Sequence, residues 1–263
     1  MQTAPQYVFI VPYRNRETHL QKFITHMPQI LEGMSYKFLF VHQCDDRMFN
    51  RGALKNIGFL FVKQSYPNTY QNIILVFNDL DCLPRHKGLL NYYVKQGEVK
   101  HFYGYTYALG GIVAIRAGDF ERIGGYPNFW GWGYEDNMLQ KRVLSGGLKI
   151  NRDVFFKANT VVIEEARKHG LPIPTELPIL QDFDGNVRTM NVHDFLQFSK
   201  NTRDGIMSFK QIVSTFNNDT GFLDVTYFDV GHEEVKEKTF KYDLANGSLP
   251  LVYNKYGKMH FGV

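Results

Sequence analysis

Cysteine, long apolar runs and dense basic blocks are all scarce in this 263-residue chain. Its two cysteines, Cys44 and Cys82, lie outside any Cys-x-x-Cys pair, which excludes a disulfide framework and argues against a structural zinc site. No apolar stretch is long enough to span a bilayer, and the first residues lack the apolar core of a signal peptide. These absences predict a cytoplasmic protein, in the host cytosol if it is viral, with neither signal peptide nor membrane anchor.

The charge balance is nearly even. The net charge is +4, and without a basic block no nucleic-acid partner is expected, although the mild excess suits a phosphate-bearing ligand. Hydrophobic residues make up 44% of the chain and aromatic residues 15%, which predicts a globular protein with a large core. No repeat, low-complexity tract or linker divides the chain, so residues 1–263 are expected to form one domain.

Strand-like and helical patterns alternate along the first hundred residues. Apolar runs at 7–12, 37–43 and 72–78 predict three buried strands. Between them, residues 20–27 and 54–61 have the apolar spacing of helices. This order predicts an α/β fold with a mainly parallel sheet covered on both faces. Ligands of such sheets bind at the carboxyl ends of the strands.

The rest of the chain shows weaker patterns. Residues 103–137 are rich in glycine and aromatic residues, which is typical of ligand-facing loops. Prolines predict a long loop within 154–189, and residues 190–213 are predicted to be partly helical. A small β-hairpin tail is expected from Asp224 onward, with a turn at 246–247.

Two carboxylates, Asp79 and Asp81, directly follow the third predicted strand. Side chains two positions apart on a strand point the same way, so both carboxylates are expected to project together. Oxygen ligands in this arrangement suit Mn²⁺, or Mg²⁺ as the alternative, bridging a diphosphate. Because such triplets also occur in solvated turns, that interpretation stays open.

An aromatic and acidic segment, FWGWGYED, occupies residues 129–136. Indole faces stack on sugar rings, and the carboxylates of Glu135 and Asp136 can bind hydroxyls or accept a proton. The alternative is a loop packed into the core before a helix whose acidic first turn complements the helix dipole. Because Trp130 and Trp132 are the only tryptophans, we favour a sugar platform.

Arginines occur directly after one predicted strand and at the start of one predicted helix. Arg14 and Arg16 follow the first strand, and Arg51 opens the second predicted helix. Strand-end arginines and helix N-termini are suited to anions. Solvated loop arginines are the alternative.

Five segments, VPYRNRETHL, FNRGALKNIGF, NDLD, LGGIVAI and GGYPNFWGWGYED, together resemble the β-1,4-galactosyltransferase family. The resemblance is strong from Val8 to Arg152, moderate at 202–206 and thin elsewhere. It implies a GT-A Rossmann-like nucleotide-sugar fold, with a nucleotide-binding half in about 1–100 and an acceptor half in about 101–263. It also implies a metal-dependent inverting transferase. Such an enzyme moves galactose, N-acetylgalactosamine or a related hexose from a UDP-sugar to a hydroxyl of a glycan or glycoside.

The resemblance also assigns roles to individual residues. The positions that it implies for nucleotide-sugar binding are Pro12, Tyr13, Arg14, Arg16, Phe49, Arg51 and Asp79. Asp81 matches the metal ligand, and Trp132 and Gly133 match the loop that contacts donor and acceptor sugars. Glu135 and Asp136 match acceptor-site carboxylates, with Asp136 at the position of the catalytic base.

The chain departs from the family pattern at several positions. Asn137 replaces a third carboxylate of the acceptor site, and Ala108 stands where galactose-using members carry Tyr. The smaller side chain is expected to leave room at the 2-position of the donor sugar, as N-acetylgalactosamine requires. The family completes its metal site with Met-x-x-His or His-x-His. His193, in Met-Asn-Val-His, is the favoured ligand, with His169 or an unrecognised residue as alternatives.

These assignments predict a direct displacement. Asp136 would accept the proton of an acceptor hydroxyl while that oxygen attacks the anomeric carbon, with the metal ion neutralising charge on the leaving UDP. A second hypothesis is a catalytically silent carbohydrate-binding protein derived from such an enzyme. A third is a glycosidase, since paired carboxylates also cleave glycosides.

Overall fold

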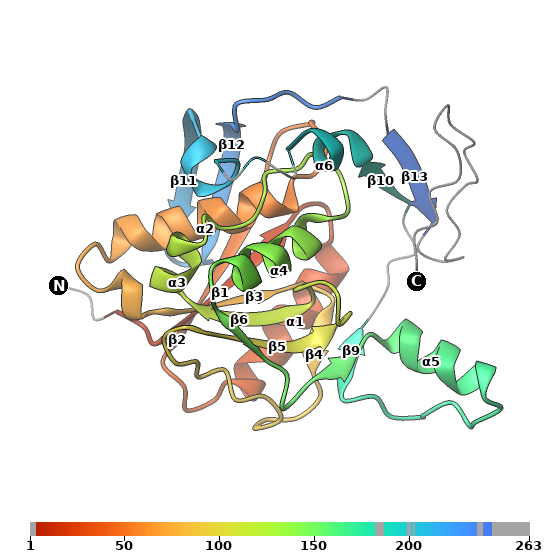
Figure 1. Ribbon diagram of the computed structural model, residues 1–263. Helices are drawn as coiled ribbons and strands as arrows, with labels where there is room; N and C mark the ends of the chain where they lie inside the picture. The colour runs from red at the N-terminus through yellow and green to blue at the C-terminus, as the bar shows by residue number, and fades with distance from the viewer. Residues whose placement is uncertain (1–3, 182–186, 199–200, 202, 236–238, 244–263) are drawn as a thin grey trace.

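The computed structural model describes residues 4–181, 187–198, 201, 203–235 and 239–243. Within these residues a nine-stranded sheet has the order β11-β12-β2-β1-β3-β6-β5-β7, with β8 beside β5 (Figure 1). Its strands are β1 (Tyr7–Tyr13), β2 (Tyr36–Gln43), β3 (Ile74–Asn78), β5 (Glu98–Gly104), β6 (Ile112–Arg116), β7 (Lys149–Asn151), β8 (Phe156–Lys157), β11 (Gln211–Asn217) and β12 (Phe222–Asp229). Five of the eight strand pairings are parallel and three are antiparallel. The prediction of an α/β fold with a mostly parallel sheet is therefore confirmed.

Two small antiparallel sheets accompany the central one. The strand β4 (Cys82–Pro84) pairs with β9 (Ile179–Gln181), and β10 (Val187–Asn191) pairs with β13 (Thr239–Asp243). The β4–β9 pair matters for the site, because β4 begins directly after Asp81.

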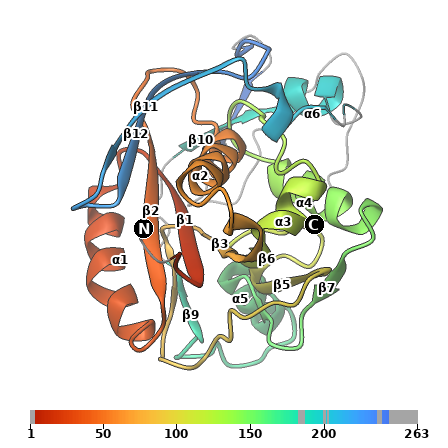
Figure 2. The same ribbon diagram turned by 90° about the vertical axis from the view of Figure 1, so that its left-hand side faces the viewer.

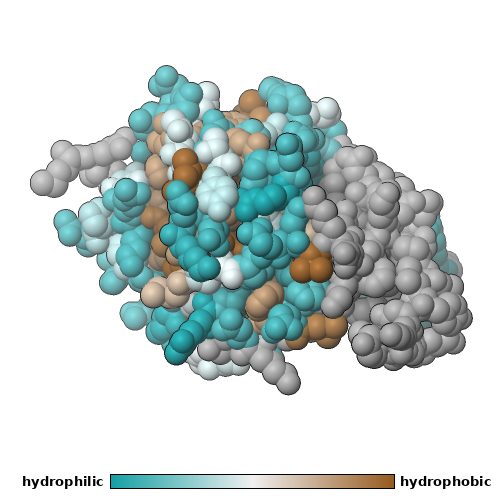
Figure 3. Space-filling model, turned by 90° about the horizontal axis from the view of Figure 1, so that it is seen from above, coloured by the Kyte–Doolittle hydropathy of each residue, from teal (hydrophilic) through white to brown (hydrophobic). Residues whose placement is uncertain are grey.

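Helices cover both faces of the central sheet (Figure 2). The described helices are α1 (Glu17–Ile30), α2 (Arg51–Ser65), α3 (Ala117–Arg122), α4 (Glu135–Ser145), α5 (Asn159–Lys168) and α6 (Val192–Phe198), with 3₁₀ turns η1 (Tyr70–Asn72) and η2 (Ile206–Ser208). Figure 3 shows a largely hydrophilic outer face with smaller apolar areas, as expected when the apolar side chains of these layers are turned inward.

The first strand shows why the core has two halves. Side chains alternate along β1, so Val8 and Ile10 belong to the cluster under α2, whereas Phe9 and Val11 belong to the cluster under α1. All of β1 is buried. A strand buried on both faces is continuously apolar, and this is why its sequence reads as an unbroken run.

Several predictions for the second half of the chain were wrong. Residues 103–137 contain β6 and α3 as well as loops, whereas the long loop predicted within 154–189 is present at 169–178, between α5 and β9. The predicted tail hairpin is instead β11 and β12 at the edge of the central sheet, where β12 runs parallel to β2. Local patterns do not reveal a pairing between strands so far apart in sequence. The predicted turn at 246–247 lies outside the described residues.

Candidate active site

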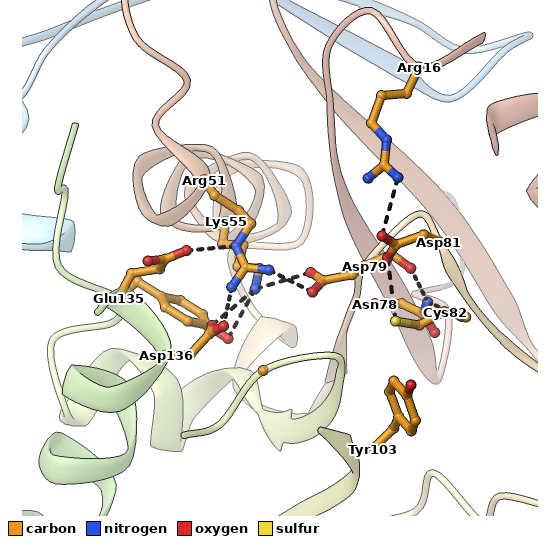
Figure 4. A network of polar contacts seen from close by, with 12 residues as sticks. Arg16, Arg51, Lys55, Asn78, Asp79, Asp81, Cys82, Tyr103, Glu135 and Asp136 are labelled. Atoms are coloured by element: carbon orange, nitrogen blue, oxygen red, sulfur yellow. Dashed lines mark hydrogen bonds and ion pairs between the residues drawn. The ribbon is translucent and has the colours of Figure 1, made fainter. Parts of the chain in front are cut away.

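The strand β3 ends in a cluster of metal-binding groups. Ligand atoms of Asp79, Asp81 and Cys82 all lie within 4.8 Å of one another, and the Cys82 thiol is 3.4 Å from an Asp81 oxygen (Figure 4). The backbone here is fixed, since the Asp79 N–H donates to the Gly111 carbonyl over 2.9 Å. The two carboxylates fit a hard divalent cation such as Mn²⁺ or Mg²⁺. Burial and the charge of Asp81 raise the pKa of the Cys82 thiol, which donates a hydrogen bond to Asp81.

A cavity of about 450 Å³ adjoins Asp81. Its wall includes the basic residues His19, Lys22 and Arg85 beside that carboxylate. A fourth basic residue, Arg16, lies between β1 and α1 and donates to Asp81 over 3.2 Å. Asp81 therefore lies between positive side chains at the edge of a hollow, where a ligand can reach it.

Arg51 joins the strand-end cluster to the predicted catalytic residues. It lies at the start of α2, whose N-cap Asn50 accepts a hydrogen bond from a backbone N–H over 2.9 Å. From there Arg51 donates to Asp79 over 2.5 Å, to Glu135 over 2.8 Å and to Asp136 (Figure 4). One guanidinium thus holds three carboxylates from two distant segments of the chain.

Lys55 adds a second cation one helical turn later. Its Nζ lies 3.6 Å from an oxygen of Asp79 and 3.6 Å from an oxygen of Asp136. The side chain is buried, and its ammonium lies 4.6 Å from the ring centre of Tyr126. Sequence reasoning missed Lys55. The four-residue spacing from Arg51 was the available signal, because it places both side chains on one helix face.

The same cations leave Asp79 and Asp136 with opposite pKa shifts. Burial raises the pKa of Asp136 to about 6, helped by Glu135 and Asp79 and opposed by Arg51 and Lys55. For Asp79, burial also acts to raise the pKa, but Arg51 and Lys55 outweigh it and the pKa is lowered. Asp79 is therefore a fixed negative charge, while Asp136 has the pKa of a group that exchanges protons near neutrality.

Glu135 and Asp136 also differ in access. The side chain of Glu135 retains 4% of its exposure, against 16% for Asp136. A β-carbon on Gly110 would lie 2.4 Å from a carboxylate oxygen of Asp136, so only glycine allows this approach. Of the two, Asp136 is the group that a substrate can reach, and Glu135 positions Arg51.

The aromatic loop separates its two tryptophans. Trp130 is buried, stacks on Phe228 at 5.2 Å, and its backbone N–H donates to the buried Asp194 over 2.7 Å. The interpretation of both tryptophans as a sugar platform is therefore wrong for Trp130, which belongs to the core. Trp132 is partly exposed and stays a candidate, with Gly133 beside it at a φ of 110°.

Two exposed tyrosines supply an aromatic surface that sequence reasoning missed. Tyr105 and Tyr107 stack at 5.3 Å, and Tyr107 is 51% exposed. The Asn137 side-chain amide donates to the Tyr107 carbonyl over 3.3 Å, which ties these rings to α4. Ala108 follows them and is buried, with its N–H 3.2 Å from the Tyr105 carbonyl. Paired exposed rings joined through Asn137 to the helix that carries Asp136, the predicted base, suit a sugar acceptor.

The residues predicted to bind the nucleotide after β1 lie in three different environments. Pro12 and Tyr13 are buried at the end of β1. Arg14 lies over the Phe49 ring at 5.1 Å, which brings both predicted nucleotide segments together. Arg16 instead contacts Asp81, on the metal side. The segment is thus positioned along the carboxyl end of the sheet, as the strand order predicted.

Comparison with known proteins identifies the family. A model of the N-terminal region of glycosyl transferase group 7 matches residues 2–94, and a model of the N-terminal domain of galactosyltransferase matches 92–163. Drosophila melanogaster β-1,4-galactosyltransferase 7 is 31% identical over 57% of this chain and 48% of its own length. Human β-1,4-galactosyltransferase 2 is 30% identical over 68% of this chain and 53% of its own length. The chain belongs to the β-1,4-galactosyltransferase family.

The fold agrees with this membership. A solved complex of a Drosophila β-1,4-galactosyltransferase 7 mutant with manganese, UDP-Gal and xylobiose has a TM-score of 0.64 and 20% identity, covering 88% of this chain and 96% of that one. This similarity confirms the GT-A fold. The chain spans about half the length of the curated relatives that it matches.

Membership in the family corrects the predicted compartment. The β-1,4-galactosyltransferases that the chain matches are Golgi-resident enzymes, so the prediction of a cytoplasmic protein is wrong. That prediction depended only on missing sequence features. Among the residues that the structure describes, no helix combines the length and the apolar character needed to cross a bilayer.

Neither predicted histidine ligand joins the Asp79, Asp81 and Cys82 cluster among the described residues. Among the described residues, neither His193 nor His169 belongs to a group of three or more metal-binding side chains. Figures 1 and 2 place α6, which carries His193, on the other side of α4 from β9. His193 Nδ1 lies 3.2 Å from Asp194, the residue that holds the Trp130 backbone, and His169 is exposed at the end of α5. In the structure His193 contacts Asp194, and its role as a metal ligand stays a prediction.

Residues 203–206, within the block where the resemblance is moderate, support the aromatic loop. The Asp204 carboxylate accepts a hydrogen bond from the Asn128 N–H over 3.0 Å, and Arg142 donates to the Asp204 carbonyl over 2.5 Å. A β-carbon on Gly205 would lie 2.2 Å from the Gly124 carbonyl oxygen, so this position requires glycine. These contacts fix the loop that leads into Glu135 and Asp136.

Proposed function

We propose that this chain is an inverting transferase that moves a hexose from a UDP-sugar to a carbohydrate hydroxyl, with residues 1–263 acting as one catalytic domain. The observation that carries the proposal is the network in which Arg51 and Lys55 join Asp79, at the strand end, to Asp136, beside the exposed tyrosines. This network places the predicted metal and donor groups next to the predicted base.

The chain's own residues account for the steps of a direct displacement. A divalent cation held at Asp81, with Mn²⁺ favoured, would supply neutralisation of the charge that develops on the UDP leaving group. Asp136 accepts the proton of the acceptor hydroxyl as that oxygen attacks the anomeric carbon, and UDP departs from the opposite face. Arg51 and Lys55 hold Asp136 in place, and Asp79 remains ionised beside the donor. One displacement inverts the anomeric centre and needs no enzyme nucleophile.

The structure and the solved relative support particular chemical classes of donor and acceptor sugar. The solved relative holds UDP-Gal and xylobiose, which supports a UDP-hexose donor and a saccharide acceptor. Tyr105, Tyr107 and Trp132 offer ring faces for the acceptor, and Asn137 offers an amide where the family often has a carboxylate. The small side chain of Ala108 favours a donor with a substituent at the 2-position. A turnover panel of UDP-galactose and UDP-N-acetylgalactosamine distinguishes the two donors.

Asp81→Asn is expected to abolish Mn²⁺-dependent release of UDP from UDP-sugars and to leave the fold intact. The amide removes the ligand charge, and Asp81 lies at a strand end beside a cavity instead of inside the core. Calorimetry of Mn²⁺ with UDP and a UDP-release assay measure the two effects. Asp46→Asn, a neighbouring strand-end change on an exposed residue, is the control and should behave as wild type. Equal Mn²⁺ dependence in Asp81→Asn would contradict the assignment, and a wild-type chain without turnover on any donor would indicate a silent binding protein.

The rate is expected to depend on the protonation of Asp136. Because its pKa is raised to about 6 and only the carboxylate accepts a proton, kcat/KM should rise with pH and level off above about pH 7. Below pH 6 it should fall about tenfold per unit. Donor binding measured over the same range is the control, since Asp79 stays ionised throughout. A rate that is constant from pH 5 to 8 would exclude Asp136 as the base.

A further inference from the structure

A second cluster of metal-binding side chains, separate from the cluster of Asp79, Asp81 and Cys82, lies where β2 meets β12. His42 Nδ1 lies 2.9 Å from an Asp224 carboxylate oxygen and 3.4 Å from the Cys44 sulfur. The sulfur is 3.9 Å from the same Asp224 oxygen. All three ligand atoms lie within 4.8 Å of one another. We propose that His42, Cys44 and Asp224 bind a zinc ion.

The backbone brings these three residues together before any ion binds. His42 and Asp224 are directly opposite in the parallel pairing of β2 with β12. Cys44 follows His42 by two positions, so its side chain points the same way, and its N–H donates to the Val225 carbonyl over 2.9 Å. The strand pairing therefore holds the three side chains close together, so that ion binding loses little further conformational entropy.

The distances match tetrahedral coordination. Zinc binds sulfur at about 2.3 Å and nitrogen or oxygen at about 2.0–2.2 Å, which places neighbouring ligand atoms roughly 3.3–3.6 Å apart. The observed separations of 2.9, 3.4 and 3.9 Å differ from these values by a few tenths of an ångström. Because Cys44 is exposed and His42 and Asp224 are partly exposed, water can complete the coordination.

The donor set is also chemically right for zinc. One imidazole, one thiolate and one carboxylate are the three side-chain types that zinc binds in proteins. Coordination requires the His42 proton on Nε2, so that Nδ1 offers its lone pair, and an ionised Asp224. The Cys44 thiol releases its proton to solvent, and its sulfur gives an electron pair to the ion.

A nucleophilic role does not fit this geometry. In a Cys-His-Asp relay the thiol and the carboxylate contact different ring nitrogens, whereas here both contact Nδ1. Burial and the charge of Asp224 also raise the pKa of the Cys44 thiol, which opposes an activated thiolate.

A bound ion would link β12 to β2 and stabilise the pairing of the two strands. The strand β12 connects the central sheet to its edge strand β11, so the ion would stabilise the β11–β12 hairpin. Binding to the folded state alone raises the melting temperature by mass action. The proposal does not rest on transferase activity, although the His42 ring lies 5.1 Å from the ring of Tyr13, a predicted nucleotide-sugar residue.

The test is a titration of the purified chain with Zn²⁺ and with Co²⁺ as a spectroscopic probe. The wild type should bind one equivalent at this site, show a sulfur-to-cobalt charge-transfer absorption, and melt at a higher temperature with Zn²⁺ than with EDTA. Cys44→Ser should abolish the absorption and weaken Zn²⁺ binding. Loss of a residue that only supports a ligand weakens metal binding by about 10–100-fold, and the effect here should be larger. His42→Ala should act in the same direction.

Cys82→Ser is the matched control, because Cys82 is the other cysteine and lies in the Asp79 and Asp81 cluster. It should retain the absorption and the Zn²⁺-dependent melting shift. Loss of both in Cys82→Ser with retention in Cys44→Ser would overturn the proposal, as would unchanged Zn²⁺ affinity in Cys44→Ser. Equal melting temperatures of Cys44→Ser and wild type in EDTA show that the variant is folded.

Discussion

Asp136→Asn is expected to lower turnover by about 10²–10⁴-fold, the usual cost of losing a general base, while UDP-sugar binding survives. Asparagine keeps the size of the side chain and can still accept a hydrogen bond from Arg51, but it cannot take up a proton. Donor binding should persist because Asp79 and Asp81, on the donor side, are unchanged. Turnover is measured by UDP release, and donor affinity by calorimetry with UDP and Mn²⁺.

Glu135→Gln is the matched control for this loss. Glu135 precedes Asp136 on α4, contacts the same guanidinium and is more deeply buried. The amide can still accept from Arg51, so its effect on turnover should be much smaller. If Glu135→Gln stops turnover and Asp136→Asn does not, the base is Glu135.

Arg51→Met is expected to lower the free energy of unfolding by about 3–5 kcal/mol, as the loss of one partner from a buried ion pair does. Its side chain is 17% exposed and contacts three carboxylates, of which Asp79 and Asp136 would keep the weaker contact with Lys55 at 3.6 Å. Urea unfolding at neutral pH measures the change. Arg122→Met is the control, because that arginine is 52% exposed and its pair with Asp119 should contribute at most about 1 kcal/mol.

The pH dependence of this deficit tests its cause. Without Arg51, the pKa values of the remaining carboxylates rise in the folded state, so the variant gains stability as the pH falls and they take up protons. The difference from wild type should therefore be smaller at pH 5 than at pH 8. A deficit below about 1 kcal/mol, or one that does not change with pH, would show that Arg51 is not the main counter-ion of the three carboxylates.

The sequence by itself determined the first half of the fold and the position of two carboxylates at the end of its third strand. The strands predicted at 7–12, 37–43 and 72–78 and the helices between them are present with small shifts of their bounds. These predictions succeeded because strands buried on both faces are continuously apolar and the intervening helices have one apolar face. Asp79 and Asp81 could be located because they directly follow such a strand.

Only the tertiary structure decided which side chains meet. Trp130 is a core residue because Asp194, 64 positions away, holds its backbone. Lys55 is part of the site because burial and folding bring two aspartates to within 3.6 Å of it. Asp79 and Asp136 are the same residue type, yet their pKa values shift in opposite directions, because each shift depends on burial and on nearby charges.

The edge of the sheet shows the same limit. The sequence argued against a structural zinc site because neither cysteine has a Cys-x-x-Cys partner, yet Cys44 meets His42 and an aspartate 180 positions away. The pairing of β12 with β2 creates that contact. Periodicity reports only which face of an element is buried, whereas strand order and register depend on the free energy of the whole packed sheet.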